Sequence, residues 1–92
     1  METALYLIPV TLGGSDVKAV LPDSNHDIIM GIKFFIVENI LSARRFLKLV
    51  DKSVDIDSLT FYELNEHTDP RDITEYLNPL KEGNSMGIIS EA

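Results

Sequence analysis

Polar side chains able to do chemistry follow each of four short apolar segments in this chain. The polar segments are residues 11–14, 38–39, 63–67 and 90–91. If the apolar segments are parallel strands joined by crossovers, their carboxyl ends meet at one edge of a sheet, where open α/β folds bind ligands. Carboxylates at such an edge can act as general bases or position a polar substrate. The sequence therefore predicts a ligand site at one sheet edge.

Four carboxylates belong to these polar segments: Glu38, Glu63, Glu66 and Glu91. Together with Asn65 and His67 they offer the kinds of side-chain ligand that a metal ion uses. The first apolar segment contributes no acid, however, and we predict no metal site. A carboxylate between a strand and a helix also caps the free amides of that helix, so a structural role for these residues stays open.

The first polar segment contains the pair Gly13 and Gly14, whose lack of Cβ atoms allows the backbone to approach a ligand closely. The pair matches neither a dinucleotide-binding fingerprint nor a phosphate-binding loop, so both kinds of nucleotide site lose support. A plain turn is the alternative. The chain contains no cysteine, and its spacing shows no catalytic Ser-His-Asp or Cys-His set.

The charge of the chain is unevenly distributed. The 92 residues carry a net charge of -7, and residues 51–92 hold ten acidic and three basic side chains. This balance disfavours a free-standing nucleic-acid binder, which would present a basic face. A basic cluster lies on a predicted helix and is typical of a solvated face; it consists of Arg44, Arg45, Lys48 and Lys52.

The length predicts a single domain, and no apolar run reaches the ~20 residues that span a bilayer. The N-terminal residues lack the features of a secretory signal. We therefore expect a cytoplasmic protein with no membrane association.

Hydrophobic patterning predicts four strands and the helices between them. The expected strands are residues 4–10, 33–37, 58–63 and 85–89. A helix is expected from Asn39 to about Val50, and a second from Pro70 to Gly83 with a kink near Asn78. One or two helical turns are expected within residues 27–31. Pro9 is expected to end pairing of the first strand. The alternation predicts an α/β fold with a mainly parallel sheet of about four strands and helices on both faces.

The order of these pieces resembles the N-terminal half of the tetrapyrrole methylase superfamily, and within it the ribosomal RNA small subunit methyltransferase I family. The likeness rests on residues 5–13, 37–47, 62–66, 80–83 and 88–92. Several positions depart from the family pattern. Residues 11–14 replace Pro-Ile-Gly-Asn, residues 38–41 replace Glu-Asp-Thr-Arg, residues 62–66 lack both histidines of His-Glu-His-Asn-Glu, and residues 90–92 replace Ser-Asp-Ala.

The resemblance implies a two-domain, usually dimeric methyltransferase that holds S-adenosylmethionine in the cleft between its domains. Residues 1–92 would then be the N-terminal domain, truncated before a C-terminal domain of the same chain and inactive alone. The acceptor would be polar, with a ribose 2′-hydroxyl of ribosomal RNA as one candidate. The competing hypothesis is a self-contained, non-catalytic α/β module that binds a ligand or regulates a partner.

The resemblance also suggests roles for individual residues. Glu38, Glu63 and Glu66 would position the acceptor or act as base, and Asn65 would bind the acceptor. The cofactor edge would comprise Pro9, Thr11, Gly13, Ser90 and Ala92.

Overall fold

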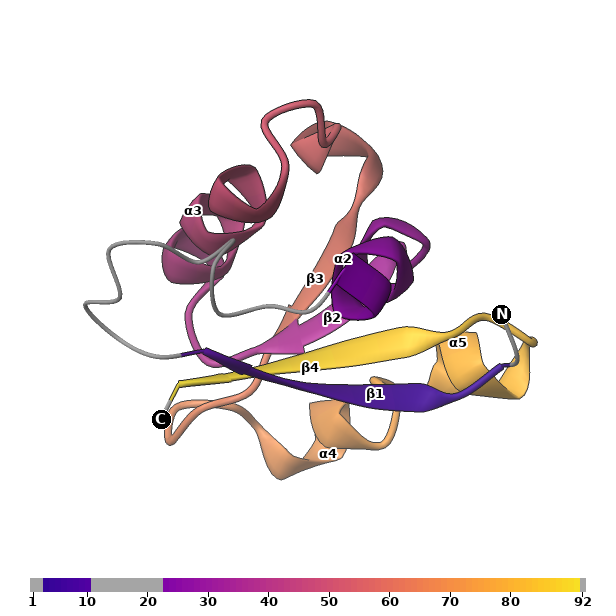
Figure 1. Cartoon of the computed structure of the whole chain (residues 1–92). Helices are drawn as coiled ribbons and strands as arrows, with labels where there is room; N and C mark the ends of the chain where they lie inside the picture. Colours follow the sequence, from indigo (N-terminus) through magenta and orange to yellow (C-terminus); the bar gives the residue numbers. More distant parts are fainter. Residues whose placement is uncertain (1–2, 11–22, 92) are drawn as a thin grey trace.

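The computed structural model describes residues 3–10 and 23–91, and within them the chain forms one four-stranded sheet. The strands are β1 (Leu5–Val10), β2 (Phe34–Val37), β3 (Thr60–Glu63) and β4 (Met86–Glu91), and all of them run parallel in the order β1-β4-β2-β3. Helices α2 (Asp23–Met30) and α3 (Ile40–Val50) lie on one face, and α4 (Pro70–Ile73) and α5 (Asn78–Lys81) lie on the other (Figure 1). The predicted fold class is confirmed.

The strand order explains why the helices divide between the two faces. The connections from β1 to β2 and from β2 to β3 advance across the sheet in one direction, whereas the connection from β3 returns and places β4 in the middle. Because parallel crossovers share one hand, reversing the direction moves the connecting helix to the opposite face. The connection that carries α4 and α5 is therefore separated from α2 and α3 by the sheet (Figure 1).

The main core lies between the sheet and the helices α2 and α3. Helix α3 begins as predicted, because the side chain of Asn39 accepts a hydrogen bond from the Ser42 amide. Its buried stripe comprises Ala43, Phe46, Leu47 and Val50. These side chains belong to one cluster that also includes Ile29, Ile32, Phe35 and Val37. The helical spacing recognised in the sequence therefore corresponds to the surface that packs on the sheet.

Gly87 lets the side chains of neighbouring strands meet over β4. A Cβ atom at this position would lie 2.9 Å from Ile8 Cδ1 and 3.0 Å from Phe35 Cδ1. Phe35 is fully buried and stacks on Phe61 of β3, with ring centroids 5.9 Å apart. The space that a side chain of Gly87 would occupy is therefore filled by Ile8 of β1 and Phe35 of β2.

The expectation that pairing stops at Pro9 is wrong. Pro9 pairs in register with Ser90, and the ladder continues to Val10 and Glu91. The amide of Met86 donates to the carbonyl of Ala4, and in a parallel ladder alternate residues turn to the same neighbour. Ala4 faces β4, and Pro9 is five residues further along, so the backbone of Pro9 faces away from β4. The N–H that proline lacks is therefore not needed for the pairing of β1 with β4.

The expected helix from Pro70 to Gly83 is two short helices. Residues 74–77 form turns, in which amides bond to carbonyls three residues earlier, as from Tyr76 to Ile73. Pro79 cannot donate to the carbonyl four residues before it, and its ring crowds that carbonyl, so a regular helix cannot pass through. The helical spacing of the sequence predicts a buried stripe here that consists of Ile73, Tyr76, Leu77 and Leu80. This stripe is only partly formed, because Ile73 and Leu77 are exposed. Gly83 ends the segment, as predicted, with φ of 91°.

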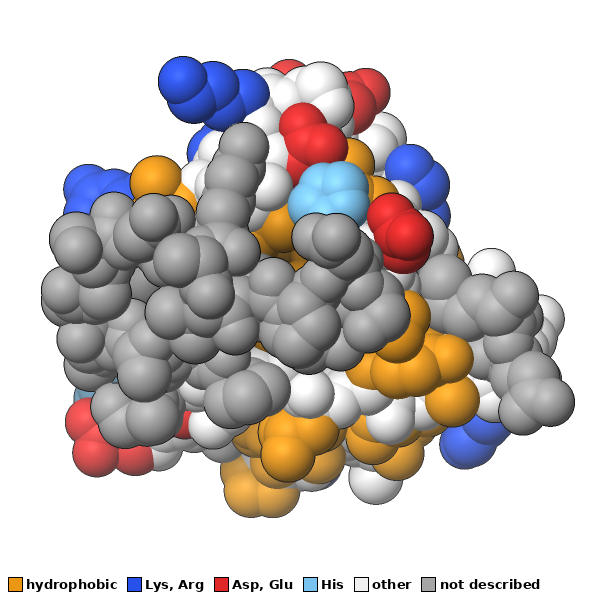
Figure 2. Space-filling model, viewed as in Figure 1, with side chains coloured by type: hydrophobic (Ala, Val, Ile, Leu, Met, Phe, Trp, Pro, Cys, Tyr) orange, Lys and Arg blue, Asp and Glu red, His pale blue; other side chains and the backbone are white. Residues whose placement is uncertain are grey.

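The other boundaries differ from the predictions by a few residues. Helix α2 begins at Asp23 rather than near Asp27, β3 begins two residues later than expected, and β4 continues to Glu91. The short helices also cover their face incompletely, since Leu5 and Leu7 of β1 are 43% and 71% exposed. Figure 2 shows apolar side chains gathered on this lower part of the molecule. Within residues 3–10 and 23–91, every helix is too short or too polar to cross a membrane.

A histidine on α2 joins that helix to the end of α3. His26 Nε2 lies 3.1 Å from Asp51 Oδ2, and its Nδ1 lies 3.4 Å from Asp27 Oδ1. Hydrogen bonds from the hydroxyl and amide of Ser53, and then from His26, lower the pKa of Asp51 to about 2. The bond to Asp51, and then that to Asp27, raises the pKa of His26 above 6.5.

We predict that Gly87→Ala destabilises the protein by about 1–3 kcal/mol, because a methyl group would overpack the contact between Ile8 and Phe35. Urea denaturation followed by circular dichroism measures the free energy of unfolding. A stability equal to that of the parent protein would show that β4 tolerates a side chain here.

We predict that His26→Gln lowers Tm at about pH 5 and changes it little at about pH 9. A raised histidine pKa stabilises the fold below 6.5, and this contribution disappears as the pH rises through the folded-state pKa. The lowered pKa of Asp51 stabilises the fold above 3.8, and that contribution disappears as the pH falls towards about 2. His67→Gln serves as the control, and equal effects of His26→Gln at both pH values would contradict the prediction.

Candidate functional site

The carboxyl ends of β2 and β3 form a crevice. These strands are neighbours, but the chain leaves β2 towards α3 on one face and leaves β3 towards α4 on the other (Figure 1). Such a switch point is where open α/β sheets bind ligands. An open depression of about 440 Å³ lies there, lined by Glu38, Leu64, Asn65, Glu66 and His67. The residues singled out in the sequence after these two strands therefore come together.

Glu63 caps a helix. One of its carboxylate oxygens accepts a hydrogen bond of 3.2 Å from the amide of Ile40, the first residue of α3. A carboxylate at a helix N-terminus satisfies a free amide and favours the helix dipole. The structural role that the sequence left open for the strand-end carboxylates, capping of a helix, therefore applies to Glu63, and the helix that it caps is α3.

Asn65 fixes the shape of the crevice. Its side-chain amide donates to the carbonyl of Glu38 at 3.1 Å, and its side-chain oxygen accepts from the amide of His67 at 2.9 Å. The residue thereby ties the exit of β3 to the exit of β2. Both ends of its amide are engaged, so Asn65 acts on a ligand chiefly by shaping the loop.

Two residues that sequence reasoning did not assign to the site hold the same loop. The hydroxyls of Thr68 and Tyr76 both donate to the Glu63 carbonyl, at 2.9 and 2.7 Å. The Thr68 hydroxyl also accepts from the Asn65 amide at 2.9 Å, and the Tyr76 ring packs 5.1 Å from that of Tyr62. In the sequence, Thr68 is recognisable only as a residue that can cap the helix beginning at Pro70, and Tyr76 only as an apolar position at helical spacing. Their contacts here depend on the fold.

The remaining polar side chains of the crevice are available to a ligand. Glu38 is exposed, and its carboxylate makes no hydrogen bond or ion pair within the part of the chain that the structure describes. Glu66 lies 3.5 Å from His67, and both side chains are more than four-fifths exposed. Among the described residues, the crevice lining contains no lysine or arginine. The crevice therefore presents the carboxylates of Glu38 and Glu66 to a ligand, whereas the side chain of Asn65 is already hydrogen-bonded within the protein.

The predicted cofactor residues of β1 and β4 continue the same edge. Pro9 pairs with Ser90, and Ile89 pairs with Val37, so that Ser90 follows at the level of Glu38. Ser90 is half-buried, and within the described residues its hydroxyl makes no hydrogen bond. Thr11, Gly13 and Ala92 lie outside the described residues. The described members of both predicted sets therefore lie along one edge of the sheet.

Among residues 3–10 and 23–91, no group of three acidic or histidine side chains is arranged to hold a metal ion. The strand-end carboxylates point to different partners, with Glu63 turned to α3 and Glu66 paired with His67.

Neither a protein-family model nor a curated protein sequence matches the chain.

We predict that Glu63→Ala lowers the free energy of unfolding by about 1 kcal/mol, because the first amide of α3 loses its cap. Urea denaturation gives the comparison with the parent protein. Glu66→Ala is the matched control, since it removes an exposed carboxylate from the same loop without breaking a cap. Equal losses for both substitutions would argue against capping.

Proposed function

We propose that this chain supplies the acceptor crevice and part of the cofactor edge of an S-adenosylmethionine-dependent methyltransferase. The observation that carries the proposal is the continuous edge from Pro9 and Ser90 to Glu38 and the loop with Glu66, at a topological switch point. The sequence resemblance to the tetrapyrrole methylases supports the reaction type. In this proposal a further domain of the complete protein closes the cleft over the edge.

The residues present fit the cofactor in position and in charge. Pro9 and Ser90 lie side by side on neighbouring strands, and the Ser90 hydroxyl makes no hydrogen bond to the described part of the chain, so it can bond to a ligand. Among the residues that the structure describes, the adjoining crevice lining contains two carboxylates and no lysine or arginine, which suits a positively charged sulfonium. When bound, the cofactor supplies an activated methyl group.

The roles of the chain's own residues follow from their contacts. Glu38 and Glu66 are free to orient a polar acceptor by accepting hydrogen bonds from it, and Glu66 is free to accept a proton from an acceptor hydroxyl or amine. Asn65 and Glu63 keep the two strand exits in place. Holding the acceptor in line with the methyl group would provide most of the rate enhancement.

The second candidate is a non-catalytic ligand-binding module. It is favoured by the engagement of Glu63 and Asn65 in capping and loop bonds, which removes two of the predicted substrate-facing side chains from direct chemistry. Such a module would use the same crevice for binding, and no methyl transfer would follow.

We predict that the complete gene product containing this chain binds S-adenosylmethionine, and that Glu66→Gln lowers methyl transfer by about 100-fold while leaving cofactor affinity unchanged. Calorimetry measures cofactor binding. Transfer of a labelled methyl group into total RNA and into small-molecule extracts measures the reaction.

Glu75→Gln is the control, because it removes an exposed carboxylate outside the crevice. If the complete product does not bind the cofactor, the proposal fails. Cofactor binding combined with unchanged transfer in Glu38→Gln and Glu66→Gln would remove this crevice from the reaction.

A further inference from the structure

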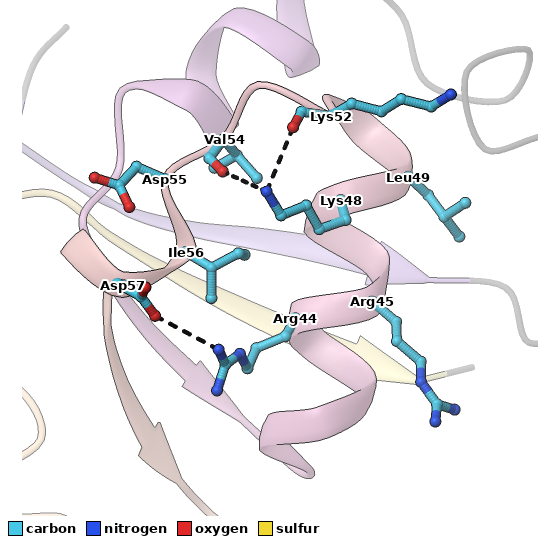
Figure 3. A pocket seen from close by; sticks show the side chains of 9 residues that line it. All are labelled: Arg44, Arg45, Lys48, Leu49, Lys52, Val54, Asp55, Ile56 and Asp57. Atoms are coloured by element: carbon cyan, nitrogen blue, oxygen red, sulfur yellow. Dashed lines mark hydrogen bonds and ion pairs between the residues drawn. The ribbon is translucent and has the colours of Figure 1, made fainter.

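Helix α3 carries a face on which large apolar side chains are exposed, and none of residues 3–10 and 23–91 packs over it. Leu41 and Leu49 are 66% and 58% exposed. Arg45 lies between them on the helix, and Lys52 follows just after the helix ends at Val50. The spacing of four residues aligns Leu41, Arg45 and Leu49 along one side of the helix. Figure 3 shows Lys52 projecting from the same flank as Arg45 and Leu49. We call these residues the α3 stripe.

The other basic residues of the helix already have partners. Arg44 lies 3.6 Å from Asp57, and Lys48 Nζ donates to the carbonyl of Val54 at 2.8 Å. Figure 3 shows both side chains pointing to the segment that follows the helix, whereas Arg45, Leu49 and Lys52 project from the other flank. Within the described residues, Arg45 and Lys52 have no ion pair. The stripe therefore combines apolar surface with two unpaired cations.

The opposite layer of the molecule carries the complementary chemistry. Around the α4–α5 connection, Ile73 and Leu77 are 38% and 40% exposed. The acidic residues Asp72 and Glu75 lie beside them in the chain, and both are exposed. Neither carboxylate forms an ion pair in the part of the chain that the structure describes. This surface, the α4–α5 surface, therefore has apolar side chains flanked by unpaired anions.

We propose that the α3 stripe docks against the α4–α5 surface of a second copy of this chain. Leu41 and Leu49 would pack on Ile73 and Leu77, while the two cations would face the two carboxylates. Burial of the leucines supplies the attraction, and the charges fix partner and register. The two surfaces lie on opposite faces of the sheet, so one copy can use both (Figure 1). Because each copy in a dimer still has one unused surface, such a head-to-tail contact can add further copies.

A second copy fits this surface better than a nucleic acid. Half of the stripe is leucine, which gains nothing from a phosphate backbone, and the net charge of -7 repels a polyanion. The same net charge also opposes self-association, so the contact is expected to be weak.

Sedimentation velocity on the 92-residue chain tests the proposal. We expect the weight-average mass to rise with concentration up to about 1 mM and to exceed that of a dimer. The substitutions Arg45→Glu with Lys52→Glu should abolish the rise, as should Asp72→Lys with Glu75→Lys. Mixing the two double variants should restore it, because every contact between unlike copies is again complementary. Lys33→Glu, which changes an exposed charge away from both surfaces, should have little effect.

Restoration in the mixture cannot arise from misfolding, and circular dichroism checks each variant alone. A chain that stays monomeric at all concentrations overturns the proposal. So does self-association that survives both double variants, or an α3 stripe that binds an RNA oligonucleotide while the chain remains monomeric.

Discussion

The rest of the structure depends on the parallel pairing of β4 with both β1 and β2. The chain returns to the middle of the sheet only after β3, so that β4, which lies between β1 and β2, is the last strand in the sequence. Its side chains meet cores on both faces, since Met86 and Ile89 are buried on opposite sides, and Gly87 admits Ile8 and Phe35. Because all strands point the same way, their carboxyl ends and the polar residues that follow them share one edge.

The polar residues at this edge divide into those that hold it and those that are free. Glu63 and Asn65 are bonded to backbone groups across the strands, so their removal would change the shape of the crevice before it changed any chemistry. Glu38 and Glu66 contribute nothing comparable to the fold and are the side chains that a ligand would meet. Loops that are held by hydrogen bonds and carry exposed polar side chains are typical of preorganised binding sites, because little conformational entropy is lost when a ligand binds.

The sequence predicted the elements whose signals are local. The apolar run of β2 and the capped, amphipathic α3 were recognised because strand burial and helical spacing leave direct patterns. The segment around Pro79 was predicted as one helix with a kink near Asn78, whereas the structure has two separate short helices, because proline opposes continuation of the helix more strongly than the apolar spacing indicates. The pairing of Pro9 was missed because it depends on which way its backbone faces in the finished sheet.

For the candidate site, the sequence likewise predicted the general position but not the individual contacts. Convergence of the strand ends followed from the alternation of strands and helices, which sequence patterns report well. The capping of α3 by Glu63 and the bond from Tyr76 to the Glu63 carbonyl were not predictable, because they join residues brought together only by tertiary packing. The strand order is likewise a property of the folded sheet, and the crevice between β2 and β3 depends on it.

A crystal structure of the complete gene product with S-adenosylhomocysteine tests the central claim, that the carboxyl edge of this sheet is the functional site. The account predicts the cofactor product at the edge formed by Pro9 and Ser90, with the crevice of Glu38 and Glu66 open beside it. A bound cofactor product on the helical faces, away from the strand ends, would contradict it.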